Sequence, residues 1–113
     1  MIGANEGDAT HLAAIDLRAL GGSADWFSHT LISQGGANLR YRTMRDSCAA
    51  FHRHDGYAEC FVVLAGSVLF DIEGGDTIQV EAGQFFAVPP GLCHRARVEG
   101  EAAMLVFDGA RPA

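Results

Sequence analysis

Hydrophobic residues occur along this chain in short runs that are rich in Val, Ile, Phe and Thr. Turn residues such as Gly66, Gly74–Gly75 and Pro89–Gly91 separate these runs. Short strand-like runs divided by regular turns are typical of an antiparallel sandwich or barrel. The pattern predicts strands over residues 26–33, 38–46, 57–64, 67–73, 77–80, 84–88, 94–98 and 102–107.

The segment from Thr10 to Leu20 fits two different elements. Its apolar residues Leu12, Ile15 and Leu20 have a loosely helical spacing, whereas the run from Leu12 to Leu17 also fits an edge strand. We expect this segment to cover the core in either form.

The length of the chain limits it to one domain. It has 113 residues and a mass of 12.0 kDa, and one hydrophobic core typically takes about 100–200 residues. No internal repeat, low-complexity tract or linker divides the sequence, so we expect a single domain over residues 1–113. With 49% hydrophobic and 19% charged residues, the composition indicates a globular protein rather than a disordered chain or a membrane span.

The charged residues argue against lysine-based catalysis and against a nucleic-acid partner. The net charge is −6, and all eight basic residues are arginines because the sequence contains no lysine. Schiff-base formation and a lysine base are therefore excluded. The arginines form no basic stripe, so we expect no nucleic-acid partner.

The N-terminus and the cysteines indicate a cytoplasmic protein. Residues 1–8 carry no positive region followed by an apolar stretch, so they do not resemble a secretory signal. The cysteines Cys48, Cys60 and Cys93 are odd in number and widely spaced, which predicts reduced thiols rather than a disulfide framework.

Four residues are candidate metal ligands. His52 and His54 are two positions apart, so an extended chain projects both imidazoles to the same side, with Cα atoms roughly 6.5–7 Å apart. Glu59 follows after a short connection, and His94 follows the Pro-Pro-Gly turn, so each could reach the same site. Three neutral nitrogens and one carboxylate suit one divalent transition metal, which could be Fe, Mn, Ni, Cu or Zn. A single histidine on a strand is more often a hydrogen-bonded core or surface residue than a ligand.

The spacing of these residues carries more weight than their number. Residues 52–66 follow the pattern HxH(x)4E(x)6G, which resembles the first motif of the cupin family. Residues 83–94 follow the pattern G(x)5PPG(x)2H, which resembles its second motif. Asp46 stands where the first motif usually opens with glycine, and Val98 stands where the second usually ends with asparagine.

The resemblance implies an all-β double-stranded β-helix, the jelly-roll barrel of cupins. It also implies a metal near one mouth of the barrel, held by His52, His54, Glu59 and His94. All four ligand positions of the family are present here, which favours a metal-dependent function. The motif glycines have structural roles, because tight turns favour positive φ at such positions.

Other residues are expected near the metal. Tyr57 has the same strand parity as Glu59, so its hydroxyl could bind a substrate or a metal-bound oxygen, or the ring could serve only as an aromatic wall. Glu59 is also a candidate proton acceptor if it leaves the metal. Glu59 and Tyr57 are therefore the catalytic candidates. Arg40 and Arg42 share one face and could clamp a carboxylate or phosphate, although arginines exposed on an outer face are the commoner outcome.

These residues favour a small metalloenzyme that acts on a small organic substrate by Lewis-acid or O₂ activation, like a dioxygenase. A metal-dependent isomerase or lyase is one alternative, and a non-enzymatic cupin that binds or senses a small ligand is another. The open edge of the strand expected at residues 26–33 and the apolar surface of so small a barrel also predict a homodimer.

Overall fold

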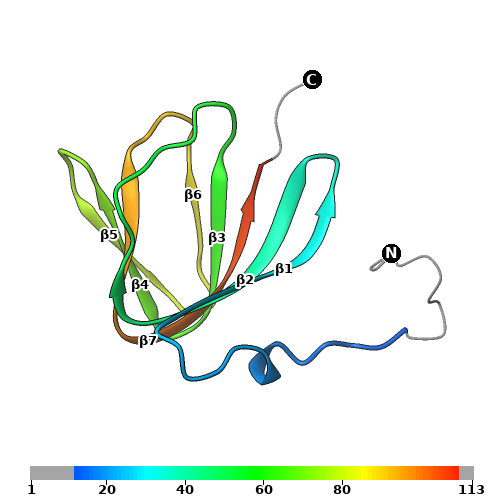
Figure 1. The fold of residues 1–113 in the computed structure, drawn as a ribbon. Helices are drawn as coiled ribbons and strands as arrows, with labels where there is room; N and C mark the ends of the chain where they lie inside the picture. Colours follow the sequence, from blue (N-terminus) through cyan, green and yellow to red (C-terminus); the bar gives the residue numbers. More distant parts are fainter. Residues whose placement is uncertain (1–11, 110–113) are drawn as a thin grey trace.

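The computed structural model describes residues 12–109 (Figure 1). Seven strands form one antiparallel sheet that bends into a barrel. Its strands are β1 (Trp26–Gln34), β2 (Ala37–Cys48), β3 (Glu59–Ala65), β4 (Ser67–Ile72), β5 (Thr77–Glu81), β6 (Phe85–Val88) and β7 (His94–Asp108). The predicted all-β fold is confirmed.

Strand β7 connects the two parts of the barrel. Its first residues pair with β4, in the register Ile72↔His94 to Leu69↔Arg97. Its second half lies between β2 and β3, and Val106 pairs there with residues of both strands. Figure 1 shows β7 passing from the β4 and β5 side of the barrel to the β2 and β3 side. The two strands expected at residues 94–98 and 102–107 are therefore one bent strand.

The bend in β7 lies opposite an irregularity in β2. Gly100 has a φ of 87°, and the register of β2 against β7 shifts between Arg45 and Ser47. Asp46 lies at this shift with a φ of 43°, and its Oδ1 accepts a hydrogen bond of 2.7 Å from the backbone N–H of Gly100. Aspartate tolerates the left-handed region because its side chain forms such local hydrogen bonds. This contact explains how aspartate replaces the usual glycine of the motif.

The hydrophobic core lies between the two halves of the sheet. Phe70 packs against Phe61 and Phe86, with ring centroids 4.5 and 4.9 Å away. Met44 and Met104 are also fully buried in this cluster. The apolar core fills one part of the barrel interior, and polar side chains line the other part.

The N-terminal segment differs from its expectation. Its regular structure among residues 12–25 is one turn of 3₁₀ helix, Leu17–Ala19, which Asp16 caps by accepting a hydrogen bond from the Arg18 backbone N–H. Leu12 and Ile15 are exposed while Leu17 and Leu20 are half-buried, so the expectation that the whole segment covers the core is wrong for its first part. Local hydrogen bonds by aspartate compete with longer helices and strands, which explains the short turn. Thr10 lies outside the described residues.

Among residues 12–109, no helix is long and apolar enough to cross a membrane.

The turn glycines Gly66 and Gly83 permit a comparison of two substitutions. Both have positive φ, of 74° and 87°, as the motifs predict. A Cβ at Gly66 would lie 2.2 Å from the Glu101 carbonyl oxygen, whereas a Cβ at Gly83 would meet nothing within 4 Å. We expect G83A to lower the free energy of unfolding by about 1–2 kcal/mol through backbone strain, and G66A by about 1–3 kcal/mol more, because backbone must move. Urea denaturation of both variants measures the difference, and equal losses would contradict the close approach of Gly66 to β7.

Candidate metal centre

Backbone pairing brings the two histidine motifs together. His52 and His94 form an isolated antiparallel bridge, in which each backbone N–H donates to the other residue's carbonyl over 2.9 Å. Their imidazole centroids are 4.5 Å apart. The segment before β3 is thereby held against the first residue of β7, although the two are far apart in sequence.

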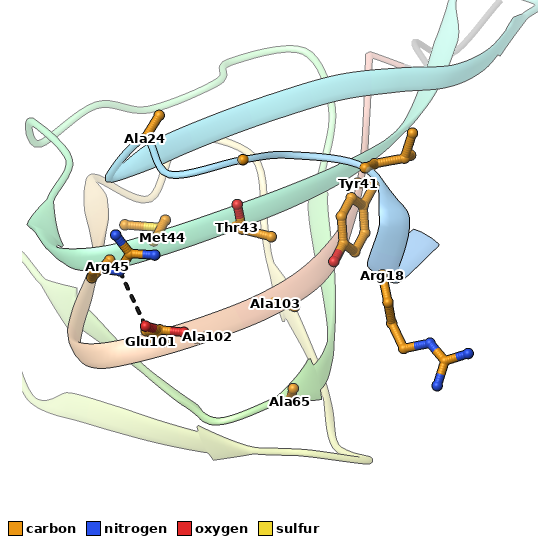
Figure 2. Close-up of a pocket in the computed structure, with 12 residues that line it drawn as sticks. Arg18, Ala24, Tyr41, Thr43, Met44, Arg45, Ala65, Glu101, Ala102 and Ala103 are labelled. Carbon is orange, nitrogen blue, oxygen red and sulfur yellow. Dashed lines mark hydrogen bonds and ion pairs between the residues drawn. The ribbon is translucent and has the colours of Figure 1, made fainter. Parts of the chain in front are cut away.

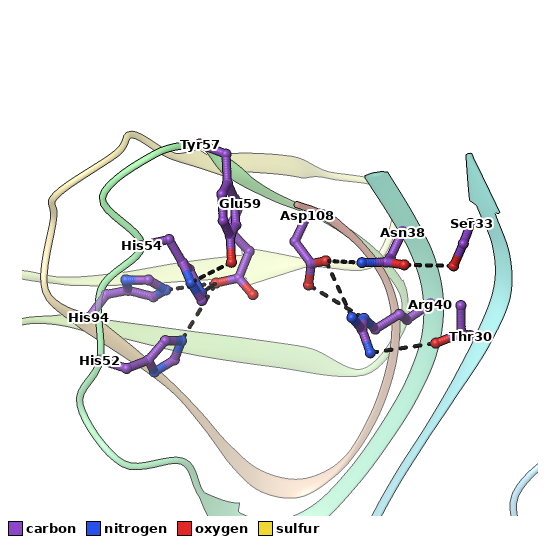
Figure 3. A network of polar contacts seen from close by, with 10 residues as sticks. All are labelled: Thr30, Ser33, Asn38, Arg40, His52, His54, Tyr57, Glu59, His94 and Asp108. Carbon is purple, nitrogen blue, oxygen red and sulfur yellow. Dashed lines mark hydrogen bonds and ion pairs between the residues drawn. The ribbon is translucent and has the colours of Figure 1, made fainter. Parts of the chain in front are cut away.

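The Glu59 carboxylate lies at the centre of the site. Glu59 is the first residue of β3 and only 4% exposed, and Figure 3 shows three imidazoles around it. Its Oε1 is 2.9 Å from the Nε2 of His94, 3.5 Å from that of His54 and 3.6 Å from that of His52. The ligand atoms of His52, His54 and Glu59 all lie within 4.8 Å of one another. His94 joins this group through its contact with Glu59.

Backbone carbonyls orient two of the imidazoles. The Nδ1 of His52 is 2.9 Å from the Ala50 carbonyl oxygen, and the Nδ1 of His94 is 2.8 Å from that of Leu92. Because a carbonyl can only accept, each Nδ1 carries the proton and donates it. In the neutral imidazoles, the lone pair is then on Nε2, the atom that faces Glu59. Metal-binding histidines are typically oriented by such a second hydrogen bond.

His54 supplies the clearest sign of an absent partner. Its Nε2 is buried and has no hydrogen-bond partner among the described residues, while its Nδ1 lies 2.8 Å from the Tyr57 hydroxyl. Buried polar atoms are normally paired, so this nitrogen, 3.5 Å from the Glu59 carboxylate, is available to a ligand. Three imidazole nitrogens and a carboxylate fit a divalent transition metal such as Fe, Mn, Ni, Cu or Zn.

The electrostatics of the site keep Glu59 ionised. Burial by itself raises the pKa of Glu59, but the hydrogen bond with His94 and the neighbouring histidines outweigh burial and lower it. Burial by itself lowers the pKa of His94, but its hydrogen bonds with Glu59 and the Leu92 carbonyl outweigh burial and raise it. In the absence of a cation, His94 and Glu59 therefore form a buried ion pair, and the carboxylate is in the form that binds a metal.

The ligands open into a cavity of about 410 Å³ inside the barrel. Arg40 and Arg42 line this cavity, so the commoner outcome of outward, exposed arginines is wrong here. In the pairing of β2 with β7, they lie opposite Val106 and Met104, whose side chains are buried inside the barrel. Arg40 and Arg42 lie on the same face of β2 as the apolar residue Met44, which was a signal in the sequence that they point inward. Only the pairing of β2 with β7 showed which face of the strand is the inner one.

Two further lining residues were not expected from the sequence. Trp26, the first residue of β1, and Asp108, the last residue of β7, both face the cavity. Nothing in the motifs marks either residue. The Tyr57 hydroxyl lies beside His54, and Tyr57 is not among the residues that line this cavity.

A second cavity, of about 270 Å³, lies between residues 18–24 and strands β2 and β7 (Figure 2). Its charged contact is an ion pair of 3.1 Å between Arg45 and Glu101. None of the residues that line it is a histidine or a cysteine, so it lacks the donors of the first cavity.

Comparisons with known proteins agree with the motifs. The family model described as the cupin domain matches residues 46–108, which is more than half of the chain. No curated protein matches the sequence.

Solved structures with a similar fold include a conserved protein of unknown function from Streptococcus pyogenes, at 21% identity and a TM-score of 0.76 over 91% of both chains. An RmlC-like cupin protein from Desulfovibrio desulfuricans is 18% identical, with a TM-score of 0.75 over 88% of this chain and 98% of its own. A cupin-2 domain containing protein from Shewanella frigidimarina is 16% identical, with a TM-score of 0.71 over 78% of this chain and 84% of its own. These likenesses concern the fold, while the match to the family model shows that the chain belongs to the cupin family.

Proposed function

We propose that this cupin binds one divalent transition metal through His52, His54, Glu59 and His94, and that it is a metalloenzyme for a small organic substrate. The observation that carries the proposal is the buried Nε2 of His54, which lacks a partner beside the ionised Glu59. A metal held there supplies Lewis-acid polarisation of a substrate oxygen or activation of O₂.

The cavity beside the ligands provides the substrate site. Its volume of about 410 Å³ suits a small molecule, and Phe61 and Trp26 give it apolar walls. These apolar walls and the polar lining residues together could hold and orient a small molecule. Glu59 is the candidate catalytic residue for accepting a proton, because it is ionised and lies at the cavity wall.

Few other groups near the cavity can transfer protons. Of the described residues that line it, the carboxylates are Glu59 and Asp108. Asp108 is engaged by Arg40 at 3.4 Å and by the side-chain amide of Asn38 at 3.2 Å. An isomerase or lyase would therefore have to use a metal ligand such as Glu59 as its base. An isomerase, a lyase and a non-enzymatic ligand-binding or sensing cupin remain the alternatives.

Tyr57 is best explained as a positioning residue. When the Nε2 of His54 binds a metal, its Nδ1 must carry the proton and donate it to the Tyr57 oxygen 2.8 Å away. The aromatic ring also stacks on the imidazole, with centroids 4.8 Å apart. Tyr57 thereby holds both the tautomer and the orientation of His54. Its proposed catalytic contact with substrate would be additional to this role.

The proposed partner is a second copy of the chain. Strand β1 lies at an end of the sheet, with an edge that is open to another strand. The outer face of β3, β6 and β7 exposes three large apolar side chains, Leu64, Phe85 and Phe107, and Phe85 is 63% exposed. A homodimer would cover this apolar face with an identical one.

The proposed location is the cytoplasm. All three cysteines are free thiols, and Cys48 is exposed. Free, accessible thiols are typical of a reducing compartment.

Elemental analysis of the untagged protein tests the metal site. We expect near-stoichiometric transition metal in the wild type and almost none in the H52A/H54A double variant. The melting temperature of the variant should also fall, because a ligand at a hundred times its Kd adds about 2.7 kcal/mol to the free energy of unfolding. His29 lies on β1 and does not line the cavity, so H29A is the matched control.

Metal content that is unchanged in the double variant would contradict the ligand assignment. Oxygen uptake with catechols, thiols or keto acids in the loaded protein would support a dioxygenase. Stoichiometric metal without oxygen uptake would favour the isomerase, lyase or sensor.

Substitution of Tyr57 tests its positioning role. We expect Y57F to weaken Zn²⁺ binding about 10- to 100-fold, since removing the partner of a metal-binding histidine has effects of this size. Isothermal titration of the metal-free protein measures the affinity. Tyr41 is buried and lines the second cavity instead of the one that holds the ligands, so Y41F should bind Zn²⁺ like the wild type. Equal affinities in Y57F and the wild type would show that the hydroxyl does not orient His54.

Light scattering tests the homodimer. We expect the wild type to have twice the chain mass of 12.0 kDa. F85E should shift the protein to the monomer, because a charge on the apolar face opposes its burial. S23E adds the same charge in the exposed segment before β1 and should leave the dimer intact. A monomeric wild type would overturn the proposal.

A further inference from the structure

Two guanidinium groups line the same cavity as the metal ligands. Arg40 and Arg42 extend from β2 into the cavity that holds His52, His54 and Glu59. Figure 3 shows Arg40 across the interior from the three imidazoles. Their contacts differ, and the difference indicates what kind of molecule the cavity binds.

Arg40 is paired with Asp108 and Thr30, although its Nε is buried without a hydrogen bond. Its Nε lies 3.4 Å from one Asp108 carboxylate oxygen, and its Nη2 lies 3.5 Å from the other. Its Nη1 donates to the Thr30 hydroxyl over 3.4 Å. The charge of Arg40 is therefore balanced within the protein.

Arg42 has no such partner. Its guanidinium lies over the Trp26 ring, with Cζ 4.9 Å from the ring centroid. Its Nε is buried without a hydrogen-bond partner, and none of the residues 12–109 forms an ion pair with it. Burial lowers the pKa of Arg42, with smaller opposing effects from Glu59 and Asp108. A cation–π contact contributes about 0.5–2 kcal/mol, and it leaves the hydrogen-bond donors of the guanidinium unused.

The balance of charge in the cavity points to a negative occupant. Once a metal displaces the proton of His94, the imidazoles are neutral, and the positive charges of Arg40 and Arg42 equal the negative charges of Glu59 and Asp108. A divalent metal at the proposed site would make the cavity positive by two charges. An anion is then the occupant that restores the balance.

We propose that Arg42 binds the carboxylate of a small organic acid in this cavity. The inference rests on the proposed function and deepens it, because it selects organic acids from among the small substrates considered. The planar guanidinium can donate two parallel hydrogen bonds to a planar carboxylate. Trp26 holds the guanidinium from one side and provides a flat apolar wall beside it. The metal ligands line the same cavity, so a short acid bound by Arg42 would share that cavity with the proposed metal.

Isothermal titration of the Zn²⁺-loaded protein with pyruvate tests this inference. We expect pyruvate to bind the wild type and to bind R42M about 10- to 100-fold more weakly, as expected for the loss of hydrogen bonds to a charged group. Methionine keeps an apolar side chain over Trp26 and removes the charge. R42K keeps the charge without the planar fork and should bind with intermediate affinity. R18M removes an exposed arginine that does not line this cavity and is the matched control.

A Zn²⁺ titration of each variant separates the two proposals. Zn²⁺ could bind R42M and the wild type equally while pyruvate binds neither protein, or binds both with the same affinity. Either result would overturn the role of Arg42 and leave the metal site standing. If Zn²⁺ does not bind the wild type, the proposed function fails. Titration of the metal-free wild type and R42M with pyruvate then tests the anion site by itself. Weaker binding to R42M would support the anion site, and equal binding would overturn it. Inorganic phosphate that binds through Arg42 in place of pyruvate would overturn the carboxylate assignment.

Discussion

The pairing of β7 with three other strands is the constraint on which the structure depends. One end of β7 pairs with β4, and the other end is held between β2 and β3. Its bend at Gly100, opposite Asp46, turns one continuous strand into part of both halves of the barrel. The first residue, His94, and the last, Asp108, both reach the cavity. The same hydrogen bonds that close the barrel therefore bring the polar residues of the site together.

The site contains several buried polar groups, and some of them have no hydrogen-bond partner among the described residues. Glu59 and His94 form a buried pair, yet the Nε2 of His54 and the Nε atoms of Arg40 and Arg42 lack hydrogen-bond partners among residues 12–109. Such groups lower the stability of a fold, and they are usual where a protein binds ligands. A cation beside His54 and an anion beside Arg42 would give these two residues partners. Because the two ligands carry opposite charges, each would favour the binding of the other. The proposed metal and the proposed carboxylate are thus two parts of one electrostatic arrangement.

The division of the barrel interior explains why this polar site can exist in so small a protein. Phe61, Phe70 and Phe86 pack together and form the apolar part of the interior. Alternation along β3 places Glu59 on the same inner face as Phe61, at the boundary between the core and the cavity. The barrel thus keeps a dry core at one side while its other side remains open to a ligand.

The sequence by itself determined the strand-rich fold, the glycine turns and the set of candidate ligands. These features depend on local rules, because alternation and turn preferences act within a few residues. It did not determine that residues 94–108 form one strand, that Leu12 and Ile15 remain exposed, or that Arg40 and Arg42 face the cavity. Alternation shows which residues share a face, but the pairing of β2 with β7 decides which face lies inside. The unpartnered charge of Arg42 is likewise a property of the tertiary structure, because it depends on neighbours contributed by distant strands.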